Sequence, residues 1–375
     1  MALARLPAAF LACLLLVCTQ SPLAQTYRSE EHSFRVVTVA SGLNYPWAVA
    51  FLPDGRMLVT ERPGRLRILT DGKPNPVPVS GLPAVTEHGQ GGLMDVALHP
   101  KFAQNGLVYL SFAARGADGV GTEVARGRLD GNRLESVEVL FRQTPKGTTG
   151  RHFGSRLVFD RAGFLYITLG DRGEMERAQM PDDHAGSVIR LHDDGRVPAD
   201  NPWARKPGWK PEKYTLGNRN MQGAALHPVT GALWTHEHGP QGGDEVNVIR
   251  AGVNYGWPVI TYGVQYVTGT RIGEGTAKPG MAQPLHYWVP SIAPSGMAFY
   301  TGNRFPRWKN DLFVGALKDR MLVRLKLAGE KVLREERMLQ GVLGRIRDVR
   351  SGPDEFIYLL TDAANGVLAR LEPAN

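Results

Sequence analysis

The sequence predicts an all-β fold, a six-bladed β-propeller of antiparallel four-stranded blades, and three observations lead to this prediction. First, one sequence pattern recurs six times: a run of alternating apolar residues, a turn with Pro, Asp or Gly, and a second run rich in Leu, Val and Tyr. Second, a further strand-like run follows most copies. Third, long helical periodicity is absent. Each hairpin cannot bury its own apolar face, so the copies must stack on one another. The six hairpins span Trp47 to Thr60, Leu93 to Phe112, Leu157 to Leu169, Ala224 to Thr235, Met297 to Ala316 and Ile346 to Thr361.

The runs that follow the hairpins supply third strands. They span Leu66 to Leu69, Glu123 to Leu129, Val188 to Leu191, Glu245 to Ile249, Met321 to Leu327 and Val367 to Leu371. The last repeat ends the chain one strand short, whereas the run Phe34 to Val39 precedes the first hairpin. We therefore expect the N-terminal strand to complete the final blade and close the ring. A linear solenoid would need polar capping repeats, and the sequence shows none.

Composition favours one large domain over residues 25–375. The chain has 375 residues, of which 42% are hydrophobic and 21% charged, so it can bury a sizeable core. No Ser/Gly-rich linker or block of charge divides the repeats. The 44 glycines and 26 prolines suit a chain dominated by tight turns.

Residues 1–24 are interpreted as a signal peptide. Arg5 precedes the apolar stretch from Ala8 to Val17, which is too short to span a bilayer, and Ala24 offers a small residue for cleavage. Export is the expected consequence. Both cysteines, Cys13 and Cys18, lie inside this segment, so the mature chain would have neither disulfides nor thiolate chemistry. A lipidated Cys18 is the alternative, although Val17 is bulky for the position before it.

The formal charge of +8 is spread along the chain. The simplest interpretation of this charge is a basic surface exposed to solvent. A nucleic-acid partner is not expected, because the chain has no module that combines basic and aromatic residues. The positive charge is also compatible with binding of an anionic small ligand.

Polar residues occupy repeated topological positions. In an up-and-down meander, the loop that enters the first strand and the loop that leaves the second strand lie at the same end of the blade. Residues in entering loops are Gln90, His152, Arg219, Asn220, Arg345 and Arg347. Residues in leaving loops are Asp171, Gly239, Pro240 and Lys318. All of them should therefore converge on one face, where loops on a rigid scaffold commonly carry binding and catalytic groups.

His152 is the candidate base. Alone, a histidine before a strand is commonly structural, but Asp171 leaves the second strand of the same hairpin, so the two side chains should meet. A carboxylate on one ring nitrogen fixes the tautomer, leaves the other nitrogen free to accept a proton, and raises the basicity of the ring. The alternative role for Asp171 is that of a turn residue before Gly173.

Four cations are expected on the same face: Arg219, Lys318, Arg345 and Arg347. They would repel one another unless an anion with several carboxylates or phosphates lay between them. Asn220 and Gln90 add neutral donors and acceptors. The alternative is that the four are surface residues that point away from one another.

The segment from Glu237 to Asn247 is a candidate calcium region. Pro240 has a fixed φ and Gly239 permits unusual backbone angles, so carbonyl oxygens there can turn toward a hard cation. Glu245 could serve a second calcium site with backbone oxygen nearby, and a plain loop is the alternative. His236 and His238 suggest zinc only weakly, because no third ligand has convincing spacing.

Together these residues resemble the soluble glucose/sorbosone dehydrogenase family, quinoproteins that use pyrroloquinoline quinone (PQQ). The resemblance covers essentially all of the mature chain. The matching strings are Gly89 to Leu93, His152 to Leu157 leading to Leu169-Gly170-Asp171, Gly217 to Asn220, Glu237 to Asn247, Leu317-Lys318 and Arg345 to Val349.

The resemblance implies roles for these residues. His152 would take the proton of the sugar C1 hydroxyl while hydride passes from C1 to PQQ, giving the lactone, and Asp171 would orient His152. Calcium held by the carbonyls of Gly239 and Pro240 would polarise the quinone. A second, structural calcium would use Glu245 and the backbone of Tyr255. The residues that would hold the cofactor are Gln90, Arg219, Asn220, Lys318, Arg345 and Arg347.

The chain looks most like the compact aldose sugar dehydrogenases of Gram-negative periplasms. The resemblance therefore implies an aldose substrate, a periplasmic location, a monomer and an electron acceptor that the sequence does not identify. The chain departs from many relatives at Ala185-Gly186-Ser187, where they show a Leu-Gly-Lys string. Tyr287, Trp288 and Tyr300 could form a platform for a sugar ring, but core packing is the commoner role of such residues.

Two other functions remain open. A propeller lactonase or similar metal-dependent hydrolase would favour inward carboxylates over a ring of cations. A non-catalytic carbohydrate- or protein-binding propeller would have no need of the His152–Asp171 pair. The cations together with that pair favour the dehydrogenase.

Overall fold

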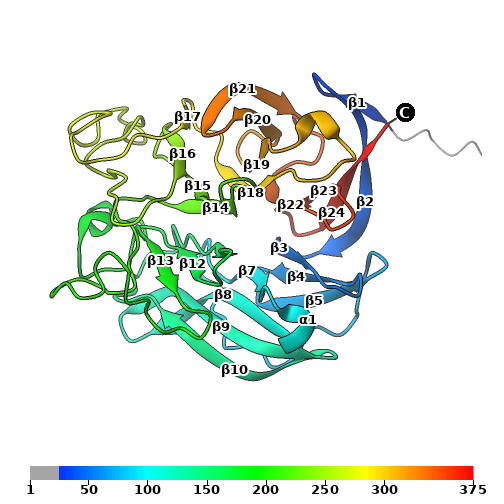
Figure 1. Ribbon diagram of the computed structural model, residues 1–375, viewed down its shortest axis with the longest axis horizontal. Coiled ribbons are helices and arrows are strands. Elements are labelled where there is room, and N and C mark those ends of the chain that lie inside the picture. The colour runs from blue at the N-terminus through cyan, green and yellow to red at the C-terminus, as the bar shows by residue number, and fades with distance from the viewer. Residues whose placement is uncertain (1–24, 375) are drawn as a thin grey trace, which may run out of the picture.

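A computed structural model describes residues 25–374 of the protein. The expected signal peptide, residues 1–24, lies outside them. The described chain consists mostly of short strands arranged in a ring (Figure 1). The strands are β1 (Thr26–Arg28), β2 (Ser33–Leu43), β3 (Pro46–Phe51), β4 (Met57–Glu61), β5 (Arg65–Thr70), β6 (Lys73–Pro74), β7 (Leu93–Leu98), β8 (Leu107–Gly116), β9 (Gly119–Asp130), β10 (Arg133–Arg142), β11 (Leu157–Phe159), β12 (Leu165–Thr168), β13 (Val188–Leu191), β14 (Met221–Leu226), β15 (Leu233–Glu237), β16 (Asp244–Val248), β17 (His286–Trp288), β18 (Pro294–Phe299), β19 (Leu312–Ala316), β20 (Leu322–Ala328), β21 (Lys331–Met338), β22 (Ile346–Ser351), β23 (Ile357–Thr361) and β24 (Gly366–Pro373). The helical elements are α1 (Phe102–Asn105) and two short 3₁₀ turns, Met175–Gln179 and Pro306–Trp308.

The strands form six antiparallel sheets, which confirms the predicted six-bladed propeller. All six expected hairpins are present, and each is the pair of first and second strands in its blade. The blades, in chain order, are β3–β6, β7–β10, β11–β13, β14–β17, β18–β21 and β22–β24 with β2 and β1.

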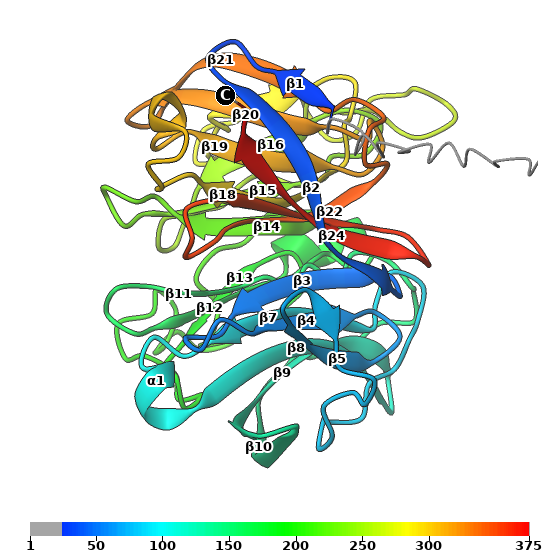
Figure 2. The same cartoon turned by 90° about the vertical axis from the view of Figure 1, so that its right-hand side faces the viewer.

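The N-terminal strand closes the ring, as predicted. β2 pairs antiparallel with β24, from Phe34 opposite Pro373 to Leu43 opposite Gly366. The two strands run side by side in Figure 2. β1 then adds a fifth strand at the outer edge of this blade.

The prediction of four strands in every blade is wrong for the third blade, which has only β11, β12 and β13. The segment after β13 returns along its edge but makes a single bridge, Ile189 to Lys213. Pro211 lies in this returning segment and has no N–H to donate to a strand ladder. The fourth position of the blade is therefore held by irregular backbone.

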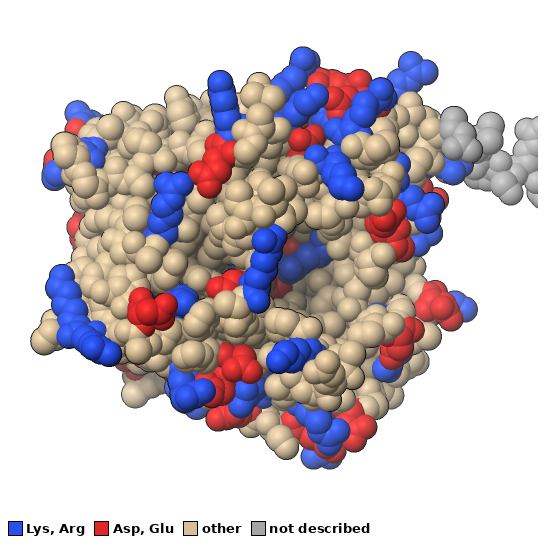
Figure 3. All heavy atoms as spheres, in the orientation of Figure 1, with Lys and Arg blue, Asp and Glu red and all other residues tan. Residues whose placement is uncertain are grey.

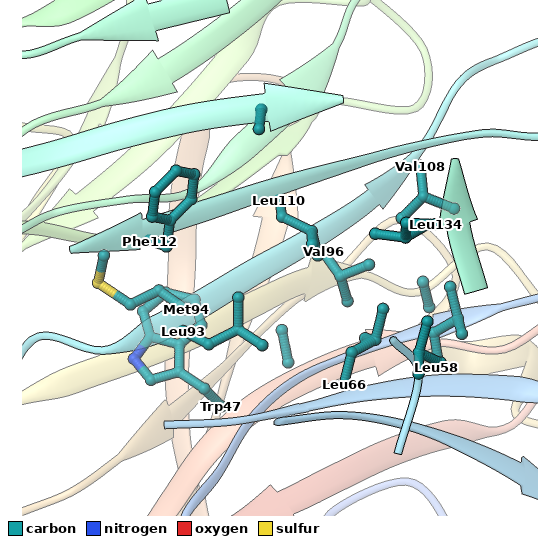
Figure 4. Close-up of a cluster of buried hydrophobic side chains, with 14 of the residues drawn as sticks. Trp47, Leu58, Leu66, Leu93, Met94, Val96, Val108, Leu110, Phe112 and Leu134 are labelled. Carbon is teal, nitrogen blue, oxygen red and sulfur yellow. The ribbon is translucent and has the colours of Figure 1, made fainter. Parts of the chain in front are cut away.

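The apolar core lies between neighbouring blades rather than within one blade. Between the first and second blades, Trp47, Leu58 and Leu66 pack against Leu93 and Phe112 (Figure 4). All five side chains are buried. This is the stacking that the amphipathic hairpins require, and it makes the blades a rigid support for the loops at their ends.

A cluster of four buried or half-buried charges ties the blades together near the inner strands. Arg156 lies 2.9 Å from Asp348 and 3.5 Å from Asp95. Arg350 lies 2.6 Å from Asp95 and 2.8 Å from Asp348. The two arginines and two aspartates balance in charge and come from the second, third and sixth blades. We call these four residues the axial ion cluster.

The axial ion cluster also reaches the remaining inner strands. The Arg156 Nε–H donates to the carbonyl of Gln222 in the fourth blade at 2.7 Å, and its guanidinium lies 4.2 Å above the Trp47 ring of the first blade. In the fifth blade, Gly296 packs so closely against Asp348 that a Cβ there would approach its Oδ1 to 2.3 Å. The cluster is thus a shared contact of all six blades.

Figure 3 shows the face onto which α1 and the turns between first and second strands project, with a hollow near its centre. Lys and Arg alternate there with Asp and Glu, so this face carries no patch of one sign. Within residues 25–374, no helix is both long and apolar enough to cross a membrane.

Candidate active site

The candidate site lies at the opposite end of the ring, where first strands begin and second strands end. A cavity of about 260 Å³ occurs there. It is lined by Gln90, Asn220, Arg345 and Arg347, four of the predicted residues. The structure therefore brings together entering loops from the second, fourth and sixth blades, as the topological argument predicts.

His152 and Asp171 are in contact beside this cavity. The Nδ1 atom of His152 lies 2.5 Å from Oδ1 of Asp171. The backbone N–H of His152 donates to Oε1 of Gln90 at 2.9 Å, which fixes the histidine at the cavity edge. The structure gives Nε2 no hydrogen-bond partner among residues 25–374. The ring is therefore arranged to donate from Nδ1 and to accept a proton at Nε2.

The backbone around this pair is shaped to bring them together. His152 itself has φ of 52°, in the left-handed region that few side chains adopt. Gly170, the residue before Asp171, packs directly against it, since a Cβ at Gly170 would approach the His152 carbonyl oxygen to 2.2 Å. Only glycine permits this approach, so the string Leu169-Gly170-Asp171 has a steric reason.

The two expected roles of Asp171 are combined. Its Oδ1 also accepts the Gly173 N–H at 2.7 Å, so it is a turn residue as well as the partner of His152. Its side chain is 1% exposed. Burial acts to raise the pKa of Asp171, but the hydrogen bond and charge of His152, together with Arg219 and the Gly173 N–H, hold that pKa below its usual value. Asp171 is therefore an anion at neutral pH.

Burial lowers the basicity of the His152 ring more than Asp171 raises it, although the effect of Asp171 has the predicted direction. Burial lowers the pKa of His152 below its usual value, and the hydrogen bond and charge of Asp171 offset this only in part. Arg219 and Arg172 add to the lowering. The imidazole is consequently neutral at neutral pH, which is the state that can accept a proton.

The cations of the cavity are partly compensated, which the sequence argument did not anticipate. Asp362 Oδ2 lies 2.8 Å from Arg345 and 3.4 Å from Arg347. Arg62 also lines the cavity. Arg62 lies 3.7 Å from the half-exposed Glu87, so three cations against two carboxylates still leave an excess of positive charge. Arg62 and Arg347 each keep a buried Nε–H with no hydrogen-bond partner among the described residues.

Sequence reasoning missed Arg62 and Asp362, although its own rule identifies both. Arg62 directly follows β4 and Asp362 directly follows β23, so each leaves the second strand of its repeat, as Asp171 does. Gln222 was missed as well. It lies inside β14, where the rule gives no signal, and its Oε1 accepts from Arg347 at 3.0 Å.

Two of the predicted cofactor residues do not line the cavity. Lys318 is exposed, and its Nζ donates to the Ser291 carbonyl at 2.8 Å. Arg219 turns away and donates from Nη1 to the carbonyl oxygens of His238 and Gly239, at 3.1 and 2.6 Å. It thus lies between the main cavity and a smaller one.

The smaller cavity, of about 10 Å³, adjoins the candidate calcium region. Gly239, Glu245 and Tyr255 line it, together with Glu237. Pro240 does not, and its carbonyl accepts from the Tyr266 hydroxyl at 2.9 Å. The volume corresponds to about one water-sized particle.

Two buried carboxylates face each other in this smaller cavity. Glu237 and Glu245 are directly opposite on β15 and β16, and Asn247 donates to both, at 3.5 and 3.2 Å. Burial, joined for Glu245 by repulsion from Glu237, raises the pKa of each above its usual range. Neither forms an ion pair within residues 25–374. Like charges opposed in a sheet are unfavourable unless a proton or a cation neutralises them.

Zinc is not supported at the neighbouring histidines. His238 Nε2 lies 2.6 Å from the Pro294 carbonyl, and His236 is buried within the fourth blade. No three His, Cys, Asp or Glu side chains in the described part of the chain gather closely enough to hold a metal. A metal site there would depend on backbone oxygens.

The three aromatic residues considered for a sugar platform do not lie together on the surface: two belong to the core and one is exposed. Trp288 and Tyr300 are buried, in agreement with the core alternative. Tyr287 is 46% exposed and stacks on Tyr262, with 3.9 Å between ring centroids.

Comparison with known proteins gives consistent matches along the chain. The family model described as glucose/sorbosone dehydrogenase matches residues 43–370. Aldose sugar dehydrogenase YliI of Escherichia coli is 47% identical over 339 residues, which cover 89% of this chain and 91% of the relative.

Solved structures of sugar dehydrogenases are similar to this chain over most of its length. The apo form of the soluble aldose sugar dehydrogenase of Escherichia coli has a TM-score of 0.89 at 45% identity, covering 91% of this chain and all of that one. The PQQ-bound form of aldose sugar dehydrogenase from Streptomyces coelicolor has a TM-score of 0.74 at 28% identity, covering 94% and 100%.

Proposed function

This chain belongs to the glucose/sorbosone dehydrogenase family, and from that membership we propose that it is a PQQ-dependent oxidoreductase that oxidises the C1 hydroxyl of aldose sugars to the lactone. The observation that carries the proposal is the His152–Asp171 pair, 2.5 Å apart, at the edge of a cavity with an excess of cations. A base and an anion-binding cavity side by side suit removal of a proton next to a carboxylate-bearing cofactor.

The residues of the cavity fit such a cofactor. Its carboxylates and quinone oxygens would meet Gln90, Asn220, Arg345 and Arg347, with Arg62 as an additional cation. Arginine guanidinium groups suit carboxylates because they can donate two parallel hydrogen bonds. Arg219 and Lys318 remain proposed cofactor residues, and each would have to leave its present carbonyl partner to reach the cavity.

PQQ, when bound, would supply the acceptor for hydride, and calcium would polarise its quinone. The protein's own part is to handle the proton. We infer that Nε2 of His152 takes the proton of the C1 hydroxyl, while the Nδ1–H donates to Asp171 and keeps the ring in that tautomer. Asp171, an anion, then stabilises the imidazolium that forms.

Calcium is proposed at two places. Gly239 and Pro240 would offer carbonyl oxygens toward the cofactor, once Arg219 and the Tyr266 hydroxyl no longer donate to them. Glu245, with Glu237 and the backbone of Tyr255, would hold a structural ion in the smaller cavity, where two buried carboxylates lack an ion-pair partner among the described residues. Carboxylate and carbonyl oxygens are the ligands that Ca²⁺ prefers.

Calcium removal should lower thermal stability. If the smaller cavity binds Ca²⁺, the ion at 100 times its Kd should add about 2.7 kcal/mol to the free energy of unfolding. Melting curves with Ca²⁺ or with chelator, without PQQ, measure this increment. In Glu245→Gln the increment should largely disappear, whereas in the surface variant Glu274→Gln it should persist, because Glu274 only pairs with exposed Lys278. A wild-type melting temperature indifferent to Ca²⁺ would contradict the proposed site.

The pH dependence of turnover follows from the lowered pKa of His152. Below that pKa the ring is protonated and accepts nothing; above it the ring is neutral and active. Since burial places the pKa below 6.5, the acid limb of kcat/KM should have its midpoint below pH 6.5. Initial rates of dye reduction across pH measure it. A midpoint above 6.5 would mean that the charge of Asp171 outweighs burial.

The proposed activity is tested by sugar-dependent dye reduction with purified mature protein, with and without PQQ and Ca²⁺. We expect activity that requires both additions, is lost on chelation and extends over several aldoses. No activity, together with no change in absorbance when PQQ is titrated, would overturn the proposal and favour the hydrolase.

The same preparations, run on a size-exclusion column, test the expected monomer. An exported, periplasmic protein remains the prediction from residues 1–24, and the natural electron acceptor is not identified.

A further inference from the structure

Trp257 makes a buried contact with the candidate catalytic pair that the sequence did not reveal. It lies in the long connection between β16 and β17, and its indole Nε1–H donates to Oδ2 of Asp171 at 2.8 Å. The Trp257 side chain is buried. The donor and acceptor come from the fourth and third blades, so this hydrogen bond crosses between blades.

Three donors among residues 25–374 bind the Asp171 carboxylate, and they divide between its two oxygens. His152 Nδ1 and the Gly173 N–H both bind Oδ1, at 2.5 and 2.7 Å. Trp257 is the donor to Oδ2. Without it, the carboxylate could rotate about its Cβ–Cγ bond and lose the orientation in which Oδ1 faces the ring of His152.

Trp257 is itself held firmly. Its backbone N–H donates to the Gly217 carbonyl at 2.8 Å, and its own carbonyl accepts from Gln179 Nε2 at 2.7 Å. The ring packs with Ala178 and Ile272. The Arg219 guanidinium lies 5.1 Å from its centroid, within the range of a cation–π contact. Because Trp257 is held on several sides, its indole N–H can hold the Asp171 carboxylate in one orientation.

We propose that Trp257 is a positioning residue, which acts through Asp171 to hold the His152 ring in the orientation required of the base. This rests on the proposed function, because the pair is assigned its role there. Trp257 is not among the residues that line the main cavity, although it lines the smaller cavity and its ring lies against Arg219. Its direct contact with the proposed base pair is the hydrogen bond to Asp171.

Trp257→Phe tests the proposal, because it keeps an aromatic ring for packing and for Arg219 but removes the N–H. The matched control is Trp288→Phe. Trp288 is also buried and also donates its indole N–H to a carboxylate, Glu335 Oε2 at 2.9 Å, away from the pair. The first readout uses cofactor-free protein: the downfield proton NMR signal of His152 Nδ1–H, assigned by its absence in His152→Asn.

In Trp257→Phe we expect that signal to shift or broaden, and in Trp288→Phe to stay in place. With PQQ and Ca²⁺ added, kcat should fall about 10- to 100-fold, with KM and the cofactor Kd within about threefold of wild type. Trp257→His, which retains a ring N–H, should recover part of that loss.

An unchanged signal in Trp257→Phe overturns the proposal, and so does a changed signal with unchanged kcat. Equal kcat losses in Trp257→Phe and Trp257→His also overturn it, because packing alone would then explain them. If the wild-type protein shows no dye reduction, the proposed function fails, while the NMR comparison still decides whether Trp257 orders the pair.

Discussion

Replacing His152 by alanine is expected to lower kcat for dye reduction about 10²- to 10⁴-fold while leaving PQQ affinity within a few-fold of wild type. The physical reason is that general-base catalysis is lost. The cations and amides that line the cavity are untouched by the change. Steady-state kinetics of the reconstituted enzyme, with absorbance titration of PQQ, measure the two quantities separately.

The chain offers a matched control in a second histidine–aspartate pair. His99 lies 3.3 Å from Asp193, outside the cavity and near the opposite end of the second and third blades. His99→Ala should leave kcat per folded molecule unchanged. Turnover retained in His152→Ala would remove His152 from the mechanism, and a matching loss in His99→Ala would indicate a general effect on folding.

Asp348→Asn is expected to cause the largest loss of stability, about 3–5 kcal/mol in the free energy of unfolding. The change removes one of the two carboxylates of the axial ion cluster. Arg156, which is 2% exposed, and Arg350 would then share Asp95 alone, leaving an uncompensated positive charge in the interior. Urea unfolding followed by tryptophan fluorescence, at constant Ca²⁺, measures the loss.

The control for this loss is Asp54→Asn. Asp54 pairs with Arg56 at 2.7 Å on the surface, where both side chains are exposed. Exposed ion pairs contribute less than about 1 kcal/mol, so this variant should unfold close to wild type. If Asp348→Asn were equally mild, the cluster would not be an important bond between blades.

The sequence predicted the propeller well because hairpin patterning is local. Alternation of apolar residues and turn chemistry act over a dozen residues, and they located all six hairpins and the closing strand β2. The missing strand of the third blade was not predictable in this way. Whether the segment near Lys213 pairs with β13 depends on loop geometry and on neighbours distant in sequence.

The site residues were predicted from their positions at the ends of blade strands. The predicted set was incomplete because such positions say nothing of residues within long loops. Blade ends identified Gln90, Asn220, Arg345 and Arg347, and His152 with Asp171. The same rule, applied to every repeat, identifies Arg62 and Asp362. It could not identify Trp257, which lies within a long loop and meets Asp171 only through the packing of two blades. The net pKa shift of His152 was also out of reach, because it depends on burial in three dimensions.

The pairing of β2 with β24 sets the order in which this protein can be completed. The final blade receives its last native strand only when residues 366–373 have been made, and only then does the N-terminal strand find its partner. Until that moment the nearly finished chain presents β23 as a free sheet edge, which can pair with other chains. A chain that stops before Gly366 would therefore lose far more than one strand. It would remain an open arc whose first and sixth blades have not been joined, exposed to aggregation and proteolysis.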